Sequence, residues 1–244
     1  MKTNQLKTVL CLAAITCACS LPAEAQLIAN GGFESGFTAW TTVDQIGSDG
    51  TFMLQTGTLS PLNGFTVPAP PGGTTAAMTD AFGPGSHLLF QDFVVPASVP
   101  AASIAFSLFI NNGNGSPQFF TPATLDFATP ALNQRARVDI MTTAADPFSL
   151  TAGDVLQNLF QTATNASLVS GYTGFSIDIT SLLQAHLGET LRLRFAEVDN
   201  VAPFNLGVDN VDITVVPEPS PAMLTIGALL VVFGFVRCRK PVEA

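Results

Sequence analysis

Alternation of apolar and polar residues between positions 26 and 215 is the feature that most constrains the fold of this chain. Arg135–Met141 alternates charged with apolar side chains, Phe175–Ile179 alternates apolar with polar ones, and Thr190–Val198 alternates again. Successive side chains of a strand point to opposite faces, so each stretch predicts a half-buried antiparallel strand. No long amphipathic helix competes with these strands. The sequence therefore predicts an all-β sandwich or jelly roll.

The remaining predicted elements are short. Further strands are expected at Thr51–Gln55, Ala76–Asp80, Leu88–Val95, Ala102–Ile110 and Leu206–Val215. A helical turn begins with Thr180 or Ser181 as its cap, runs through Leu187 and ends at Gly188. Asp154–Gln161 is the other candidate helix.

The N-terminal segment Met1–Ala25 has the three parts of a secretory signal peptide. Lys2 and Lys7 precede an apolar stretch, which is followed by Ala23-Glu24-Ala25 as a small-residue cleavage site. The pattern predicts export, with a mature chain that starts near Gln26.

The C-terminus carries three blocks in a fixed order. Val216–Pro221 is rich in proline, Ala222–Val236 is apolar, and residues 237–244 open with the basic cluster Arg237-Cys238-Arg239-Lys240. Because proline fixes φ and cannot donate to a β-ladder, the first block predicts an extended linker, so the folded domain spans 26–215. The apolar block predicts a transmembrane segment, and the cations would hold its far end in the cytoplasm.

These three blocks resemble the PEP-CTERM sorting signal of Gram-negative bacteria that make extracellular polysaccharide. The matching residues are Val216, Pro217, Glu218 and Pro219 in the motif, and Arg237, Arg239 and Lys240 in the stop-transfer tail. The resemblance implies an exosortase as partner, a transient stay in the inner membrane, and a final location at the cell surface or in the extracellular matrix. The alternative is a permanent anchor. As a helix, Ala222–Val236 would span roughly 22 Å, against a hydrocarbon core of about 30 Å, which favours the sorting signal.

The charges of the predicted ectodomain, residues 26–215, limit its partners. Four arginines and no lysine stand against fifteen carboxylates, a net charge of −11. Such a domain would be repelled by phosphate backbones, so the composition argues against nucleic-acid binding. The ectodomain has no cysteine, which excludes disulfides, thiol catalysis and cysteine-based metal sites in it. Its acidity suits solubility outside the cell and binding of divalent cations.

Two short motifs at the ends of the ectodomain resemble the galactose-binding-like jelly-roll family, which includes many carbohydrate-binding modules. One runs from Asn30-Gly31-Gly32, a turn expected to need positive φ, through Glu34 to Trp40. The other is Gly207–Val211, with Asp209 at its centre. The resemblance implies that the first and last strands are neighbours and that Glu34 and Asp209, with backbone carbonyls, bind a structural Ca²⁺. The alternative makes both of them ordinary turn residues.

No catalytic motif stands out, and we expect no enzyme activity. The two histidines, His87 and His186, are expected to be solvated or structurally hydrogen-bonded, and no nucleophile elbow, zinc-binding helix or phosphate loop occurs. Two functions stay open. The first is a non-catalytic surface or matrix protein in contact with exopolysaccharide. The second is a carbohydrate-binding module, in which Trp40 would stack on a sugar unless it is a core or rim residue.

Overall fold

The computed structural model describes residues 25–61, 63–80, 82–111, 119–166 and 169–216. These residues belong to one compact unit, residues 24–216. The predicted signal peptide, apart from Ala25, lies outside the described residues, as do Pro217, Glu218, Pro219, the apolar segment and the basic tail. Within the described ranges, no helix has the length and apolar character needed to cross a bilayer.

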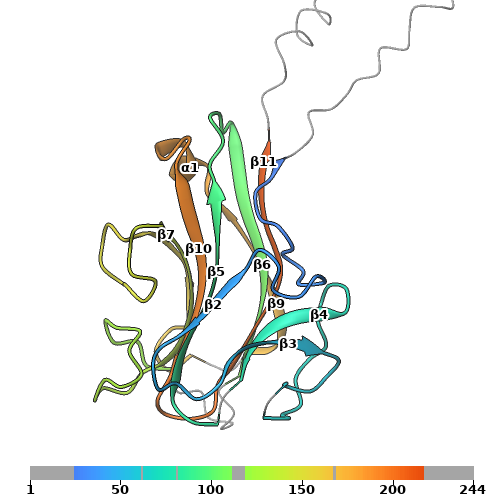
Figure 1. Ribbon diagram of the computed structural model, residues 1–244, viewed down its shortest axis with the longest axis vertical. Coiled ribbons are helices and arrows are strands. Elements are labelled where there is room, and N and C mark those ends of the chain that lie inside the picture. The colour runs from blue at the N-terminus through green and yellow to red at the C-terminus, as the bar shows by residue number, and fades with distance from the viewer. Residues whose placement is uncertain (1–24, 62, 81, 112–118, 167–168, 217–244) are drawn as a thin grey trace, which may run out of the picture. The chain divides into compact units, whose positions relative to one another are not determined.

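Eleven strands and one helix make up the described residues. They are β1 (Ala25–Gln26), β2 (Thr41–Asp44), β3 (Thr51–Thr56), β4 (Thr75–Asp80), β5 (Gly85–Val94), β6 (Ala101–Asn111), β7 (Gln134–Thr142), β8 (Val155–Gln161), β9 (Val169–Asp178), α1 (Thr180–Ala185), β10 (Thr190–Asp199) and β11 (Asn205–Val216). Sheet A has the order β3-β4-β11-β6-β9, with β1 also paired to β11, and sheet B has the order β2-β5-β10-β7-β8. The two sheets face each other in Figure 1. The predicted all-β sandwich is confirmed.

The strand pairing is nested. β4 pairs with β11, β5 with β10, β6 with β9 and β7 with β8, all antiparallel. Eight strands that pair first with last in this way, and that alternate between two sheets, form a jelly roll.

The core lies between the two sheets. Large buried side chains from both sheets and from the opening turn meet there, among them Phe33, Phe106 and Phe195. β11 follows the predicted alternation, with Val211, Ile213 and Val215 buried.

A second apolar cluster covers the outer face of sheet B and corrects one expectation. It joins Leu88, Ala196 and Val198 of the sheet to Leu125 and to side chains of the loops that cross this face. As a result, residues 134–141 of β7 are buried on both faces, so the prediction of a half-buried strand was wrong there. The loops that cover the sheet come from other parts of the sequence, and the alternation in β7 carries no trace of them.

Two local predictions also change. Residues 155–161 form strand β8 at the edge of sheet B instead of a helix, because pairing with β7 determines their conformation. Helix α1 forms where expected and Gly188 has φ +77°, but Ile179 occupies the cap position without a side-chain cap. The Thr180 hydroxyl bonds the backbone of Ala102 instead.

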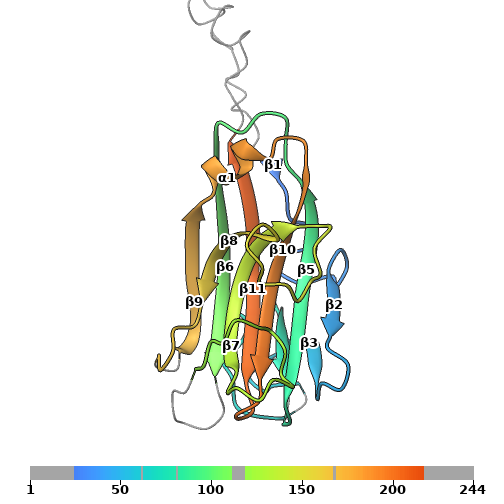
Figure 2. The same cartoon turned by 90° about the vertical axis from the view of Figure 1, so that its left-hand side faces the viewer.

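Both ends of the ectodomain leave it at the same end of the sandwich. Ala25 pairs with Val215, and Val216 still pairs with Ala101, so the last strand includes the first residue of the predicted linker. Figure 2 shows the connection that follows β10 at the opposite end. We call this the loop end; it holds loops 45–50, 82–84 and 200–204.

Candidate functional site

The opening turn binds directly to the last strand. The Val211 amide donates to Gly31 O at 3.0 Å, which confirms that the two ends of the domain are neighbours. The turn has positive φ as expected, at Asn30 (51°), and so does Phe33 (56°), whereas neither glycine of the turn has it. Gly31 is needed for another reason: a Cβ there would lie 1.8 Å from Val211 O. Glycine therefore permits a close backbone approach at this position.

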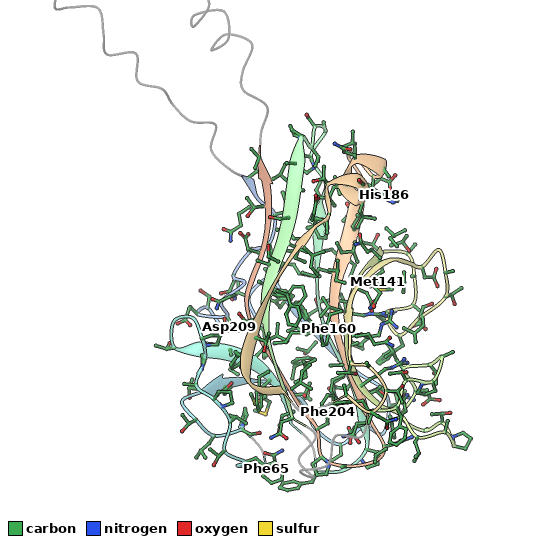
Figure 3. The ribbon with its side chains drawn as sticks, turned by 180° about the vertical axis from the view of Figure 1, so that it is seen from behind. Phe65, Met141, Phe160, His186, Phe204 and Asp209 are labelled. Atoms are coloured by element: carbon green, nitrogen blue, oxygen red, sulfur yellow. The ribbon has the colours of Figure 1, made fainter. Side chains whose placement is uncertain are left out.

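Glu34 and Asp209 both accept hydrogen bonds from loop 72–75, and we call the pair the acidic clasp. Glu34 accepts hydrogen bonds from the amides of Thr74 and Thr75, both at 2.8 Å, and from the Thr74 hydroxyl. Asp209, on β11, accepts from the Gly72 amide at 3.0 Å and from the Asn210 amide at 2.7 Å. The clasp thus ties loop 72–75 to both ends of the domain. Figure 3 labels Asp209 at the side of the sandwich.

The two carboxyls of the clasp differ in environment. Hydrogen bonds from Thr74 and Thr75 lower the pKa of exposed Glu34. Burial, together with a smaller effect of the Glu34 charge, raises the pKa of Asp209 to about 6, against the hydrogen bonds from Gly72 and Asn210. Calcium takes six to eight oxygen ligands. Among the described residues, no group of three or more His, Cys, Asp or Glu gathers in a metal-binding arrangement, so the clasp supplies two carboxylates and any other ligands would be carbonyls or water.

Trp40 lies in the core. Its side chain is 7% exposed, its ring centroid is 5.2 Å from that of Phe33 and 6.1 Å from that of Phe195, and its Nε1 donates to Asn30 O. The indole is thus packed inside the protein and offers no open face for a sugar. This position agrees with the core role that the sequence analysis gave as the alternative for Trp40.

A small cavity opens at the loop end, and we call it the distal cavity. Its volume is ≈ 130 Å³, and its lining residues are Phe82, Gly83, Pro84, Asp199, Asn200, Val201, Ala202 and Pro203. Phe82 is 62% exposed and packs edge-on against Phe65, with 5.9 Å between ring centroids. The Asp49 carboxylate accepts the amides of Phe82 and Gly83 and so fixes this wall of the cavity.

Three buried ionisable groups lie in or next to the wall of the distal cavity. Asp199 lines it, Glu197 is two residues earlier on β10, and His87 is directly opposite Glu197 on β5. Burial raises the pKa of Glu197 well above its ordinary value, and the charges of Asp199 and Asp44 add to that. Burial also raises the pKa of Asp199 to about 7, although a hydrogen bond from the Gly85 amide lowers it. The folded protein therefore holds a proton on this pair more firmly than the unfolded chain does.

Both histidines are hydrogen-bonded, as expected. His87 is fully buried, with Nδ1 2.7 Å from Asp44 Oδ1 and Nε2 3.1 Å from Asp49 O. His186 contacts Glu189 at 2.9 Å and lies near the end where the chain leaves the domain (Figure 3).

A groove lies on the outer face of sheet A near Val216. Its volume is ≈ 310 Å³, and it is lined by Ala101, Ala102, Ser103, Ser176, Asp178, Thr180, Thr214 and Val216. Its walls are hydroxyl groups, one carboxylate and small apolar side chains, without an aromatic ring. It belongs to the end of the domain where the chain leaves.

Sequence reasoning missed the distal cavity. Glu197 lies in the predicted strand Thr190–Val198 and Asp199 directly follows it. Both fall at alternate positions where the pattern would place core side chains, so two carboxylates there are an available signal. Phe82 gives no such signal, because a phenylalanine within a segment that contains Gly and Pro is expected to be buried in the core. Its exposure is known only from the fold.

No family model and no curated protein matches this chain. Several solved structures are similar to it. The chain is similar to TmCBM61, solved with β-1,4-galactotriose (12% identity, 78% of this chain and 97% of that one, TM-score 0.46). It is similar to the K3 adhesin domain of Lys-gingipain from Porphyromonas gingivalis (14%, 79% and 99%, TM-score 0.47). A third is an apo cyclase from Fischerella sp. (18%, 81% and 98%, TM-score 0.47).

Proposed function

We propose that this protein is a non-catalytic adhesion protein, exported and sorted to the cell surface or extracellular matrix, whose loop end contacts extracellular polysaccharide. The observation that carries the proposal is the arrangement of the domain's ends. β1 and the last residues of β11 are paired neighbours, so both connections to the rest of the chain leave from one end. A tether at that end would direct the loop end away from the membrane.

The loop end has side chains suited to such contact. Phe82 is exposed and Ile46, in loop 45–50, is 99% exposed. Aromatic and apolar side chains that remain in water at one end of a domain are typical of binding surfaces. For the carbohydrate-binding alternative, we therefore propose the distal cavity as the sugar-contact site in place of Trp40.

Retention on polysaccharide tests the proposal. We expect Phe82→Ala to reduce the fraction of protein that sediments with polysaccharide from the producing cells by about threefold to tenfold, because an aromatic contact is lost. Leu187→Ala is the matched control, since Leu187 is 45% exposed but lies beside α1 at the other end. Equal retention of wild type and Phe82→Ala would exclude the loop end as the contact.

The sorting part of the proposal predicts processing of the C-terminus. Replacement of Pro217, Glu218 and Pro219 by alanine should leave full-length protein in the inner membrane, because the rigid polar linker presented to the processing enzyme is lost. Mass spectrometry of the C-terminus provides the measurement. Wild-type surface protein that still ends at Ala244 would show a permanent anchor instead.

Calcium at the acidic clasp belongs to the same proposal. A ligand that binds only the folded state raises the melting temperature by mass action. We expect Ca²⁺ to raise the melting temperature of the wild type and to have no such effect on Asp209→Ala. A wild-type melting temperature that is the same in Ca²⁺ and in chelator would leave Glu34 and Asp209 as hydrogen-bond acceptors for loop 72–75 alone.

A further inference from the structure

The distal cavity combines an aromatic wall with a buried carboxyl. Phe82 forms the exposed wall, and Asp199, only 2% exposed, reaches the same cavity from the end of β10. The volume of ≈ 130 Å³ is well below the ~300–1,000 Å³ of pockets that enclose whole drug-sized ligands. The cavity thus fits one residue of a longer chain.

Asp199 has hydrogen-bonding capacity to spare. Its Oδ1 receives no hydrogen bond from a donor group in the described part of the chain, and neither oxygen of fully buried Glu197 receives one. The two carboxyls adjoin, and they can bond each other only while one of them carries a proton. Gln134, directly across the ladder from Asp199, is also fully buried, and its side-chain amide has no partner among the described residues.

Among the described residues, no arginine pairs with Asp199. Arg137 and Arg194 pair with Asp139, and Arg192 pairs with Asp92. Arg135, across the ladder from Val198, donates to the carbonyl of Thr124. Of the groups facing the pair, His87 approaches Glu197 at 3.9 Å while it contacts Asp44, and Asp49 adds negative charge to Asp199. The site is therefore an acidic cavity without its own counter-ion.

We propose that the distal cavity binds a pyranose residue that carries an ammonium group, with the apolar face of the ring against Phe82 and the ammonium paired with the Asp199 carboxylate. The ammonium group would donate to Asp199 Oδ1, which has no donor among the described residues, and a proton carried by Asp199 would pass to the solvent. A charge-assisted hydrogen bond is roughly twice as strong as one from a neutral hydroxyl or amide. Sugars with carboxylates would be repelled by the net charge of the ectodomain. The inference rests on the proposed function, because it names the sugar class that the adhesion contact would recognise.

Titration calorimetry of the full-length chain with two probes tests the inference. The probes are β-1,4-linked tetramers of glucosamine and of N-acetylglucosamine, which differ in their charge and acetyl groups. At pH 7, we expect the wild type to bind the glucosamine tetramer at least about tenfold more tightly. Asp199→Asn, which keeps the size and an acceptor for the Gly85 amide, should bring the two affinities to within about twofold.

Two further variants separate ring contact from charge. Phe82→Ala should weaken both tetramers by similar factors, because it removes the wall that both rings share. Asp178→Asn removes a carboxylate from the groove on sheet A and should leave the ratio unchanged, which separates local pairing from general attraction to an acidic protein. If Asp199→Asn does not fold, the salt dependence of wild-type binding is measured instead. The ratio of the two tetramer affinities must then fall as NaCl rises from about 0.05 to 0.5 M. These concentrations shorten the Debye length from roughly 14 to 4 Å.

The outcomes distinguish this inference from the proposed function. Equal wild-type affinity for both tetramers overturns the ammonium pairing and leaves neutral glycan binding in place. A preference that survives Asp199→Asn or high salt also overturns it. Retention on native polysaccharide without binding of either tetramer overturns the amino-sugar inference alone, whereas loss of that retention is the failure of the proposed function.

Discussion

Asp139→Asn should lower the free energy of unfolding by about 3–5 kcal/mol, because it leaves two buried guanidinium groups without an anion. Asp139 is fully buried on the outer face of sheet B. It accepts two hydrogen bonds from Arg137, at 2.8 and 2.6 Å, and one from Arg194 at 2.5 Å. Asparagine has the same size, but its amide would turn N–H groups toward these donors. For a domain of this size the loss corresponds to roughly 6–20 °C in melting temperature.

The pH dependence of this effect has a definite sign. Burial alone would raise the pKa of Asp139, but the hydrogen bonds from Arg137 and the charges of Arg194 and Arg137 outweigh it and hold the pKa below the ordinary 3.8. A carboxyl with a lowered pKa contributes stability that is complete above pH 3.8 and is lost as the pH falls through the folded-state value. Wild type and Asp139→Asn should therefore differ fully at pH 7 and converge in strong acid.

Asp92→Asn is the matched control. Asp92 also binds an arginine through two hydrogen bonds, from Arg192 Nε at 2.7 Å and Nη2 at 3.0 Å, but its side chain is 38% exposed. An exposed ion pair contributes roughly 0–1 kcal/mol, so chemical denaturation should show a small change. Similar losses in the two variants would mean that the buried position of Asp139 does not matter.

These ion pairs mark the limit of what the sequence could predict. The alternation in Thr190–Val198 and Arg135–Met141 located β10 and β7 correctly, because it records the inner face that each strand gives to the core. It also placed the arginines on the outer face, where solvent was expected. Loops 119–133 and 143–154 cover that face, and Arg194 donates to the carbonyls of Pro147 and Ser149 in the second of them. Contacts between a strand and distant loops leave no periodic signal.

The candidate site was also predicted only in part. Short motifs at the two ends of the domain placed Glu34 near Asp209, and the structure brings both to loop 72–75. Neither motif names that loop, whose amides hold the two carboxylates. The distal cavity depends on where β4, β5 and β10 end relative to one another. That arrangement follows from strand pairing, so no local stretch of sequence contains it.

Gly31→Ala should lower the free energy of unfolding by about 3 kcal/mol or more. This is the upper end of the usual cost of added bulk in a packed interior, because the new methyl group meets backbone atoms. A Cβ at this position would lie 1.8 Å from Val211 O and 2.7 Å from Val211 C. Both are backbone atoms, so neither can move away by rotation about a side-chain bond. The opening turn must therefore move away from β11, and the 3.0 Å hydrogen bond from the Val211 amide to Gly31 O is then lost.

Gly32→Ala provides the control for this last prediction, since it makes the same chemical change one residue later. The nearest heavy atom to a Cβ at Gly32 is Asp209 Oδ1 at 3.9 Å, an ordinary contact distance. Its φ lies outside the left-handed region, so alanine adds no backbone strain. We expect its melting temperature to stay within a few degrees of wild type while that of Gly31→Ala falls clearly. Equal stability of the two variants would mean that the opening turn does not press against the last strand, and the neighbourhood of Glu34 and Asp209 would lose its structural basis.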